Sequence, residues 1–368
     1  MYKGKTVAVV ITAYNEEGLV GDVIDTLPTF VDRAYVVDDA STDGTWGEIK
    51  RHSTALNAAR SAASVVDGDE TGEVAVPIRH ETNSGVGGAI KTGYRRAYEE
   101  GMDVTVVLNG DGQMDPDILD RIIDPIVEGR ADYAKGNRLM SREHTGDMST
   151  WRQFGNGILT FLTKVASGYW KTMDPQNGYT AISYRALDSI DIDDLYEEYG
   201  FLNDLLVKLN AYNMRVADVE MQAIYGEETS TIRYSTFIPA LSLLLLRSFL
   251  WRLKVRYLVY DFHPLVLLYA LGSVGLLATV VQSGVLIATG IGGVLAWSTV
   301  GLAALFSGFA LSLAMSFDLM NNEHLERQVL ATDSASIRYR SRMTVESEED
   351  DASKGQIRSE SAVTESSS

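Results

Sequence analysis

The chain has 368 residues, enough for one large domain and a smaller addition. Its 50 acidic and 32 basic residues give a net charge of −18, which argues against a nucleic-acid-binding protein, because phosphate backbones require an excess of basic surface. This acidity indicates a strongly hydrated surface, typical of halophilic proteins in a high-salt cell interior. The absence of cysteine excludes disulfides, thiolate catalysis and cysteine-ligated zinc.

Short β-branched runs alternate with helical stretches up to about residue 225, a pattern typical of an α/β fold with a mostly parallel sheet and helices on both faces. We predict strands at residues 6–11, 34–37, 74–78, 104–108 and 133–136, and helices at residues 17–27 and 86–100. Residues 53–72, rich in Ala, Ser, Asp and Gly, predict a loop. Ligands of such sheets bind beyond the carboxyl ends of the strands, so the residues after each strand are the site candidates.

The last third of the chain has the features of a membrane module. Residues 236–260 predict an amphipathic interfacial helix, with the basic side chains Arg247, Arg252, Lys254 and Arg256. Residues 264–317 carry no charge and predict two transmembrane helices joined near residues 289–293, because one span needs only about 20 apolar residues. Basic residues on both flanks predict that the α/β part and both termini lie in the cytoplasm.

These patterns predict four segments. Residues 1–231 form the α/β domain, 232–262 the basic interfacial segment, 263–320 the transmembrane hairpin, and 321–368 an acidic, largely disordered cytoplasmic tail. The leading apolar run is too short for a signal peptide. We expect a chain that ends before His263 to fold alone and to bind anionic membranes through its basic helix.

Polar residues follow the first two predicted strands. Thr12, Ala13, Tyr14 and Glu16 follow the first strand, and Asp39 follows the second. An aromatic ring can stack on a nucleotide base and a carboxylate can accept hydrogen bonds from the base edge. The alternative is helix capping, by Asn15, Ser41 and Asp43.

Two further loops have residues that suit the binding of a nucleotide or a metal ion. Asn83, Gly85 and Gly88 lie where the chain turns into a helix, a place where glycines let the backbone approach a nucleotide. Asn109, Asp111 and Gln113 place oxygen-bearing side chains at alternate positions, and such oxygens suit Mg²⁺. The alternative for this fourth loop is a surface turn with a helix start at Asp115–Pro116.

The segments TAYNEE, VVDDASTDGT, NSGVGGAIKTGY and LNGDGQMDPD, in this order, resemble the family 2 glycosyltransferases of the GT-A fold, with dolichyl-phosphate mannose and glucose synthases as the most similar members. The resemblance covers about residues 6–235. It implies an inverting enzyme that transfers a sugar from a nucleotide diphosphate to polyprenyl (dolichyl) phosphate at the cytoplasmic face of the cell membrane, for protein or surface glycosylation. It also implies Mg²⁺ or Mn²⁺ and contact with membrane lipids, and it leaves homo-oligomer formation open.

The resemblance assigns roles to individual residues. The residues implied to hold the nucleotide are Thr12, Ala13, Tyr14, Glu16, Asp39, Asn83, Gly85 and Gly88. The residues implied to bind the metal and diphosphate are Asn109, Asp111 and Gln113. The residues implied to act in catalysis are Asp111, Gln113, Arg138, Asp174 and Asp204, and those implied for the acceptor or lipid phosphate are Arg142, His144 and Arg233. Asn109 departs from the family, which often has Asp here, so metal binding is expected to be weaker.

Two alternatives remain open. Transfer to the hydroxyl of a lipid-linked or surface glycan would require a base such as Asp174 or Asp204. A noncatalytic membrane scaffold is supported only by Asn109. A phosphate acceptor needs no strong base, because a phosphate monoester with a second pKa of about 6 is mostly dianionic at neutral pH.

Overall fold

The computed structural model describes residues 1–67, 73–140, 150–221, 234–290 and 292–330. By internal contacts the chain divides into two compact units, Met1–Arg327 and Gln328–Ser368. The first unit contains both the α/β part and the apolar helices, so it covers three of the four predicted segments and the first residues of the fourth. The predicted segment borders themselves stay predictions.

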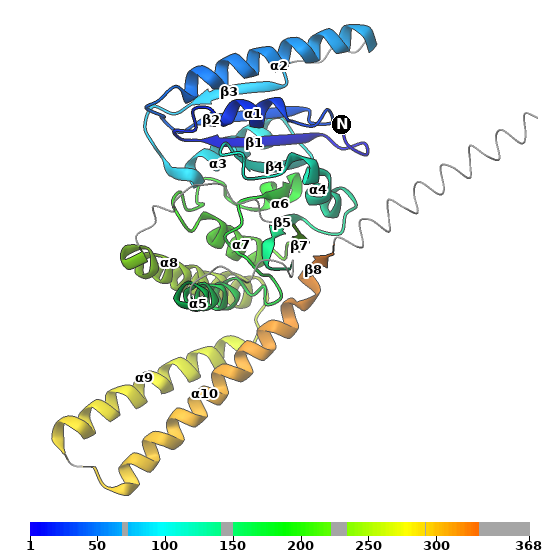
Figure 1. Ribbon diagram of the computed structural model, residues 1–368. Coiled ribbons are helices and arrows are strands. Elements are labelled where there is room, and N and C mark those ends of the chain that lie inside the picture. The colour runs from blue at the N-terminus through cyan, green and yellow to red at the C-terminus, as the bar shows by residue number, and fades with distance from the viewer. Residues whose placement is uncertain (68–72, 141–149, 222–233, 291, 331–368) are drawn as a thin grey trace, which may run out of the picture. The chain divides into compact units, whose positions relative to one another are not determined.

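An eight-stranded sheet forms the centre of the α/β part, in the order β3-β2-β1-β4-β6-β5-β7-β8 (Figure 1). Strands β3, β2, β1 and β4 are parallel, as are β5 and β7, whereas β6 runs antiparallel to both β4 and β5. The predicted mostly parallel sheet is therefore confirmed. The strands are β1 (Val7–Ala13), β2 (Arg33–Asp38), β3 (Ala75–Arg79), β4 (Val104–Asn109), β5 (Tyr133–Asn137), β6 (Thr180–Ser183), β7 (Val216–Glu220) and β8 (Glu326–Val329).

Helices pack against this sheet. Helices α3, α6 and α7 contribute to one buried cluster with alternate side chains of β1 and β2, and α4 packs on β4 to β7. Alternate residues of a strand point to opposite faces, so the β-branched runs that predicted the strands are buried. The helices of this part are α1 (Val20–Asp25), α2 (Thr45–Asp67), α3 (Gly85–Glu99), α4 (Leu119–Val127), α5 (Thr150–Ser167), α6 (Tyr184–Ser189) and α7 (Phe201–Ala211), with short 3-10 turns η1 (Pro116–Ile118) and η2 (Arg138–Met140).

The predicted loop at residues 53–72 is wrong over most of its length. Helix α2 continues to Asp67, and residues 68–72 lie outside the described ranges. The Ala-rich composition of this stretch favours a helix more strongly than its Ser and Asp residues disfavour one. Asn57 also ties the helix to the sheet, because its side chain accepts hydrogen bonds from the backbone of Val74 and Ala75.

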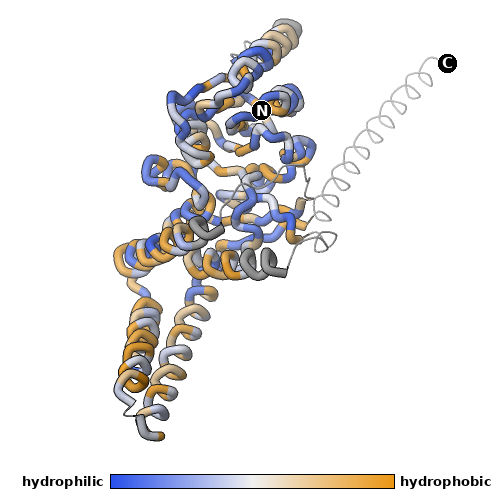
Figure 2. The backbone as a smooth tube through the Cα atoms, turned by 60° about the vertical axis from the view of Figure 1, so that its left-hand side comes forward, coloured by the Kyte–Doolittle hydropathy of each residue, from blue (hydrophilic) through white to orange (hydrophobic). Residues whose placement is uncertain are grey.

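Two long apolar helices follow the α/β part. Helix α8 (Tyr234–Lys254) continues into a π-helical turn η3 (Val255–Tyr260), and then α9 (Leu265–Thr289) and α10 (Val294–Asn322) lie side by side (Figure 1). Both are long and apolar enough to cross a membrane, and hydrophobic residues predominate along them (Figure 2). The predicted pair of helices and the break near residues 289–293 are confirmed as structural features.

The expectation for the basic helix is wrong at two of its four positions. Arg247 and Lys254 are exposed, but Arg252 and Arg256 are buried in contact with the protein. Arg252 binds both carboxylate oxygens of Asp318 on α10, at 3.0 and 2.8 Å, and Arg256 donates to Asn210 on α7. Arg252 is buried because Asp318, which directly follows the charge-free stretch, provides its counter-charge, whereas Arg256 is held by oxygens of Asn210.

Candidate active site

The parallel register brings three strand ends to one edge of the sheet. Thr12 pairs with Asn109 and Ala13 pairs with Asp38. Beyond the strands, Asp39 N donates to Ala13 O at 2.9 Å and Gly110 N donates to Thr12 O at 2.8 Å. The segments predicted to hold a nucleotide and a metal therefore begin next to one another.

The loops after β1 and β2 are joined by side-chain hydrogen bonds. Asn15, with a positive φ of 57°, accepts from Thr42 N at 2.9 Å, and its own N–H donates to Ser41 Oγ at 3.0 Å. Glu16 N donates to Thr45 Oγ1 at 2.8 Å. Several polar residues of the two motifs thus have a structural role. Tyr14, in contrast, is 47% exposed beside them, which leaves its ring accessible to a base.

Asp39 is buried and held in a fixed orientation. Its Oδ1 accepts from Ser84 N at 2.8 Å and lies 2.7 Å from Nδ1 of His80, whose Nε2 lies 2.9 Å from Thr92 Oγ1. A depression of about 460 Å³ adjoins this group, and His80 is part of its lining. His80 was not predicted as a site residue, although it directly follows β3, as the predicted residues follow the other strands.

The glycines after β3 have a structural explanation within the chain. A Cβ at Gly87 would lie 2.5 Å from the carbonyl oxygen of Glu197, and a Cβ at Gly88 would lie 2.5 Å from Ser84 Cβ. Gly85 has φ +78° and donates to Asn83 Oδ1 at 3.0 Å. Close packing inside the protein accounts for these residues, so glycine content gives no support to the predicted nucleotide role of Asn83, Gly85 and Gly88.

Asp111 and Asn109 lie at the end of β4. Asp111 Oδ1 accepts from Gln113 N at 3.0 Å in a tight turn. Asp115 accepts from Asp117 N at 2.9 Å and caps η1, as the helix-start interpretation predicted. Within the described ranges, no group of three or more His, Asp or Glu side chains is placed to hold a metal ion. One carboxylate with nearby amides fits a hard cation that takes its other ligands from water and a diphosphate.

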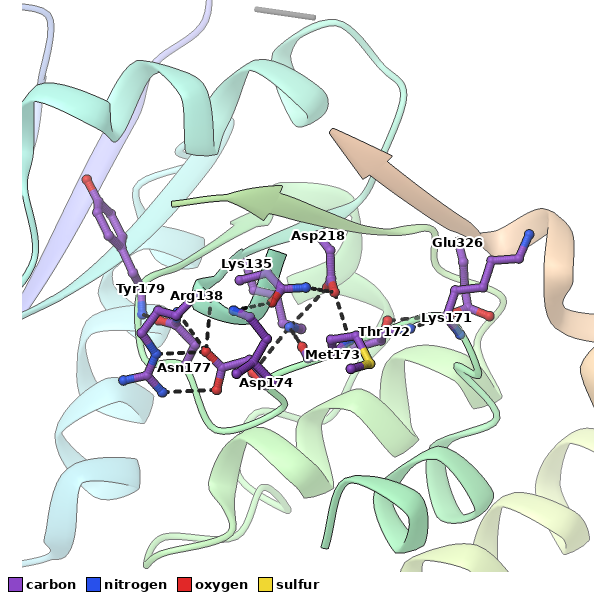
Figure 3. A network of polar contacts seen from close by, with 12 residues as sticks. Lys135, Arg138, Lys171, Thr172, Met173, Asp174, Asn177, Tyr179, Asp218 and Glu326 are labelled. Carbon is purple, nitrogen blue, oxygen red and sulfur yellow. Dashed lines mark hydrogen bonds and ion pairs between the residues drawn. The ribbon is translucent and has the colours of Figure 1, made fainter. Parts of the chain in front are cut away.

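Arg138 and Asp174 form a two-point ion pair (Figure 3). Arg138 Nε and Nη2 lie 2.7 and 2.9 Å from the two carboxylate oxygens. The arginine side chain is 41% exposed and the aspartate 10%. Burial alone would raise the pKa of Asp174, but hydrogen bonds and charge from Arg138, together with Lys135, hold it below its ordinary value. Asp174 therefore holds the Arg138 guanidinium, and its carboxylate is a weak proton acceptor.

Asp204 lies in the first turn of α7, and its carboxylate is engaged by other residues of the chain. It is 6% exposed on α7, where one oxygen accepts from Ser248 Oγ at 3.0 Å and the other from Tyr196 N at 3.1 Å. It also pairs with Lys208 at 3.2 Å. Both oxygens thus join α7 to its neighbours, and the predicted catalytic role has no structural support.

The three residues predicted for the acceptor phosphate lie outside the described residues. Arg142 and His144 fall within residues 141–149, and Arg233 falls within residues 222–233. Their predicted roles stay predictions.

The family model described as Glycosyl transferase family 2 matches residues 8–191, which include the three strand ends and the Arg138–Asp174 pair. The chain belongs to this family. Family membership confirms the predicted resemblance and the class of enzyme, a glycosyltransferase.

Individual members of glycosyl transferase family 2 are also similar to the chain. UDP-N-acetylglucosamine--dolichyl-phosphate N-acetylglucosaminyltransferase of Methanococcus voltae is 30% identical over 224 residues, 61% of this chain and 87% of the relative. Undecaprenyl-phosphate mannosyltransferase of Micrococcus luteus is 29% identical over 232 residues, 60% and 84% of the respective chains. Among solved structures, glucosyl-3-phosphoglycerate synthase from Mycobacterium tuberculosis, in complex with phosphoglyceric acid, is 20% identical with a TM-score of 0.44, over 68% and 81% of the chains.

Proposed function

We propose that the protein transfers a sugar, with inversion, from a nucleotide diphosphate to a polyprenyl (dolichyl) phosphate at the cytoplasmic face of the membrane. The observation that carries the proposal is the register of β1, β2 and β4, which places Tyr14, Asp39 and Asp111 at one sheet edge in a chain that also holds two apolar helices. The names of two similar proteins, which refer to dolichyl phosphate and undecaprenyl phosphate, support the acceptor class.

The donor binds at the ends of β1 and β2 in this proposal. The exposed ring of Tyr14 stacks on the base, and Glu16 lies two residues further along the same loop. Asp39 accepts hydrogen bonds from the base edge, and its contacts with Ser84 and His80 keep its carboxylate in place.

The diphosphate lies toward the end of β4. Asp111, with the amides of Asn109 and Gln113, would hold Mg²⁺ or Mn²⁺ together with the diphosphate oxygens. A bound cation would neutralise charge on the leaving nucleoside diphosphate. Because Asn109 adds no negative charge, the metal should bind weakly without the nucleotide and more tightly with it.

The reaction is a single displacement. An oxygen of the acceptor phosphate attacks the anomeric carbon, and the bond from that carbon to the diphosphate oxygen breaks with its electron pair leaving on the diphosphate. Arg138, held by Asp174, provides positive charge close to the phosphates. The acceptor phosphate has a second pKa of about 6, so no proton has to be removed at neutral pH.

The two carboxylates considered as bases for a hydroxyl acceptor are both engaged. Asp174 pairs with Arg138 and has a lowered pKa, and Asp204 is buried with both oxygens bonded. These contacts favour a phosphate acceptor over a glycan hydroxyl.

Exposed apolar side chains support a position at the membrane surface. Helices α5 and α8 pack together, and each exposes large hydrophobic residues. The exposed residues are Ile158 and Phe161 on α5 and Leu243, Leu246 and Leu250 on α8. Such a surface, with the exposed Arg247 and Lys254, fits the headgroup region of a cytoplasmic leaflet.

The test is an incubation of the purified protein with a panel of radiolabelled nucleotide sugars, polyprenyl phosphate and Mg²⁺. Label should enter the organic phase in a form that mild acid releases. If label instead enters only a preassembled glycan supplied in place of polyprenyl phosphate, the acceptor is a hydroxyl group and the proposed phosphate acceptor is wrong.

A further inference from the structure

A carboxylate that follows the second apolar helix is bound by a distant loop of the α/β part. Glu326 accepts hydrogen bonds from three consecutive backbone N–H groups, those of Trp170, Lys171 and Thr172, at 2.9, 2.6 and 2.9 Å. Thr172 Oγ1 adds a contact at 3.4 Å. Glu326 is 5% exposed, and about 155 residues of sequence separate it from the loop. The geometry is that of a built anion site occupied by a side chain of the same protein.

Consecutive backbone N–H groups form a concave site that favours negative charge. Here Glu326 fixes the backbone of the loop, because the N–H groups of residues 170–172 must all point toward its one carboxylate. Without it, Thr172, which is 6% exposed, would have a buried N–H group with no acceptor. The loop conformation therefore depends on a residue outside the loop.

The residues that follow in the loop are held in the same way (Figure 3). Met173 N donates to Asp218 at 2.8 Å. Lys135, itself paired with Asp218 at 3.0 Å, donates to the carbonyl oxygens of Met173 and Asp174. Asp174 adopts a φ of +48°, which is uncommon for a residue with a side chain and needs support from its surroundings. An unbroken row of contacts thus leads from Glu326 to the carboxylate that holds Arg138.

We propose that Glu326 is a positioning residue for the transfer reaction: it holds residues 170–174 so that Asp174 keeps the Arg138 guanidinium in place. The inference rests on the proposed function in that Arg138 faces a phosphate of the donor or acceptor. Glu326 acts through the loop and makes no contact with reacting atoms. The segment after the membrane hairpin is therefore part of the apparatus that shapes the active site.

The main variant is Glu326→Gln, which keeps the size of the side chain but places an NH₂ donor among three N–H donors. We expect kcat to fall about tenfold to a hundredfold, as for a catalytic group displaced by about 1 Å. KM for the nucleotide sugar should change little, because Tyr14 and Asp39 belong to other loops. Glu326→Asp, which keeps the charge, should restore part of kcat.

The matched control is Glu323→Gln. Glu323 lies three residues earlier, is 57% exposed, and pairs with the Lys171 side chain at 2.8 Å. It contacts the same loop without binding its backbone, so its loss should leave kcat unchanged.

A double variant tests whether the two residues act together. Glu326→Gln combined with Arg138→Ala should have the kcat of Arg138→Ala alone, because both changes remove the contribution of a correctly placed Arg138 guanidinium. Effects that multiply would overturn the inference.

Amide hydrogen exchange tests the positioning independently of turnover. Glu326→Gln should speed exchange at residues 170–174 and at Arg138, whose N–H lies 3.4 Å from Asp174 Oδ2, while Glu323→Gln should not. Unchanged exchange overturns the inference, and so does faster exchange with normal kcat. If the wild type ignores polyprenyl phosphate, the proposed acceptor is wrong, yet the exchange result still supports or overturns the positioning role.

Discussion

Removal of one partner of the buried pair Arg252–Asp318 should destabilise the protein strongly, because the other charge then stays buried alone. Each side chain is 0% exposed, and the pair joins α8 to α10 with two hydrogen bonds. Arg252 also donates to the carbonyls of Val165 and Ala166 at the end of α5. Asp318→Asn leaves the guanidinium buried without a counter-charge, which typically costs about 3–5 kcal/mol of unfolding free energy.

Removal of both charges should cost less than removal of one. Arg252→Met with Asp318→Leu removes both charges of the pair, although two helix-end carbonyls lose a donor at about 1 kcal/mol each and the buried Arg256 loses the attraction of Asp318. Chemical unfolding in detergent micelles, followed by tryptophan fluorescence, measures both variants. Lys171→Gln, which breaks the exposed pair with Glu323, is the control and should change nothing measurable. A double variant less stable than Asp318→Asn would refute the reasoning.

Four further outcomes are expected. Asp111→Asn should lower turnover about a hundredfold or more without loss of folded protein. Asn109→Asp should lower the Mg²⁺ concentration needed for half-maximal activity. Activity measured against metal concentration checks both variants. A tag after Ser368 should be accessible only from the cytoplasmic side, as protease protection in vesicles would report. Burial alone would raise the pKa of Asp132, but Arg215 holds it below its ordinary value. The stabilisation it provides is therefore present above about pH 4, so the difference in unfolding free energy between wild type and Asp132→Asn should disappear as the pH falls through the lowered pKa. In contrast to the expectation from composition, a chain that ends before His263 should be unstable, because it lacks Asp318 and Glu326. Its yield and unfolding midpoint would show this.

The sheet could be predicted where strands are runs of buried β-branched residues. Strands β1, β2 and β4 lie within a residue or two of their predicted bounds for this reason. Strand β6 was missed because it has only four residues and pairs with β4 and β5, which are distant in sequence. Periodicity in a short window has no information about such pairing.

The site could be predicted in the same local sense. Residues that directly follow strands, such as Asp39 and Asp111, were found because parallel strands bring their ends together. The Arg138–Asp174 pair and the position of Asp204 under α8 depend on contacts between elements that are separated in sequence. The sequence indicated residues that could bind a nucleotide or a metal ion or act in catalysis. It did not indicate which of these side chains bind one another in the folded protein.

Two acidic residues at and after the end of α10 connect the pair of apolar helices to the α/β part. Asp318 lies on the last turns of α10 and binds Arg252, and Glu326 follows within eight residues and binds the backbone of residues 170–172. From composition alone, the charge-free stretch and the acidic residues after it read as an anchor followed by a polar tail. In the structure Asp318 provides the counter-charge of a buried arginine, and Glu326 accepts hydrogen bonds from three consecutive backbone N–H groups of the α/β part. A chain that ends before them would keep strands β1 to β7 but lose β8, together with the counter-charge and the acceptor that the interior requires.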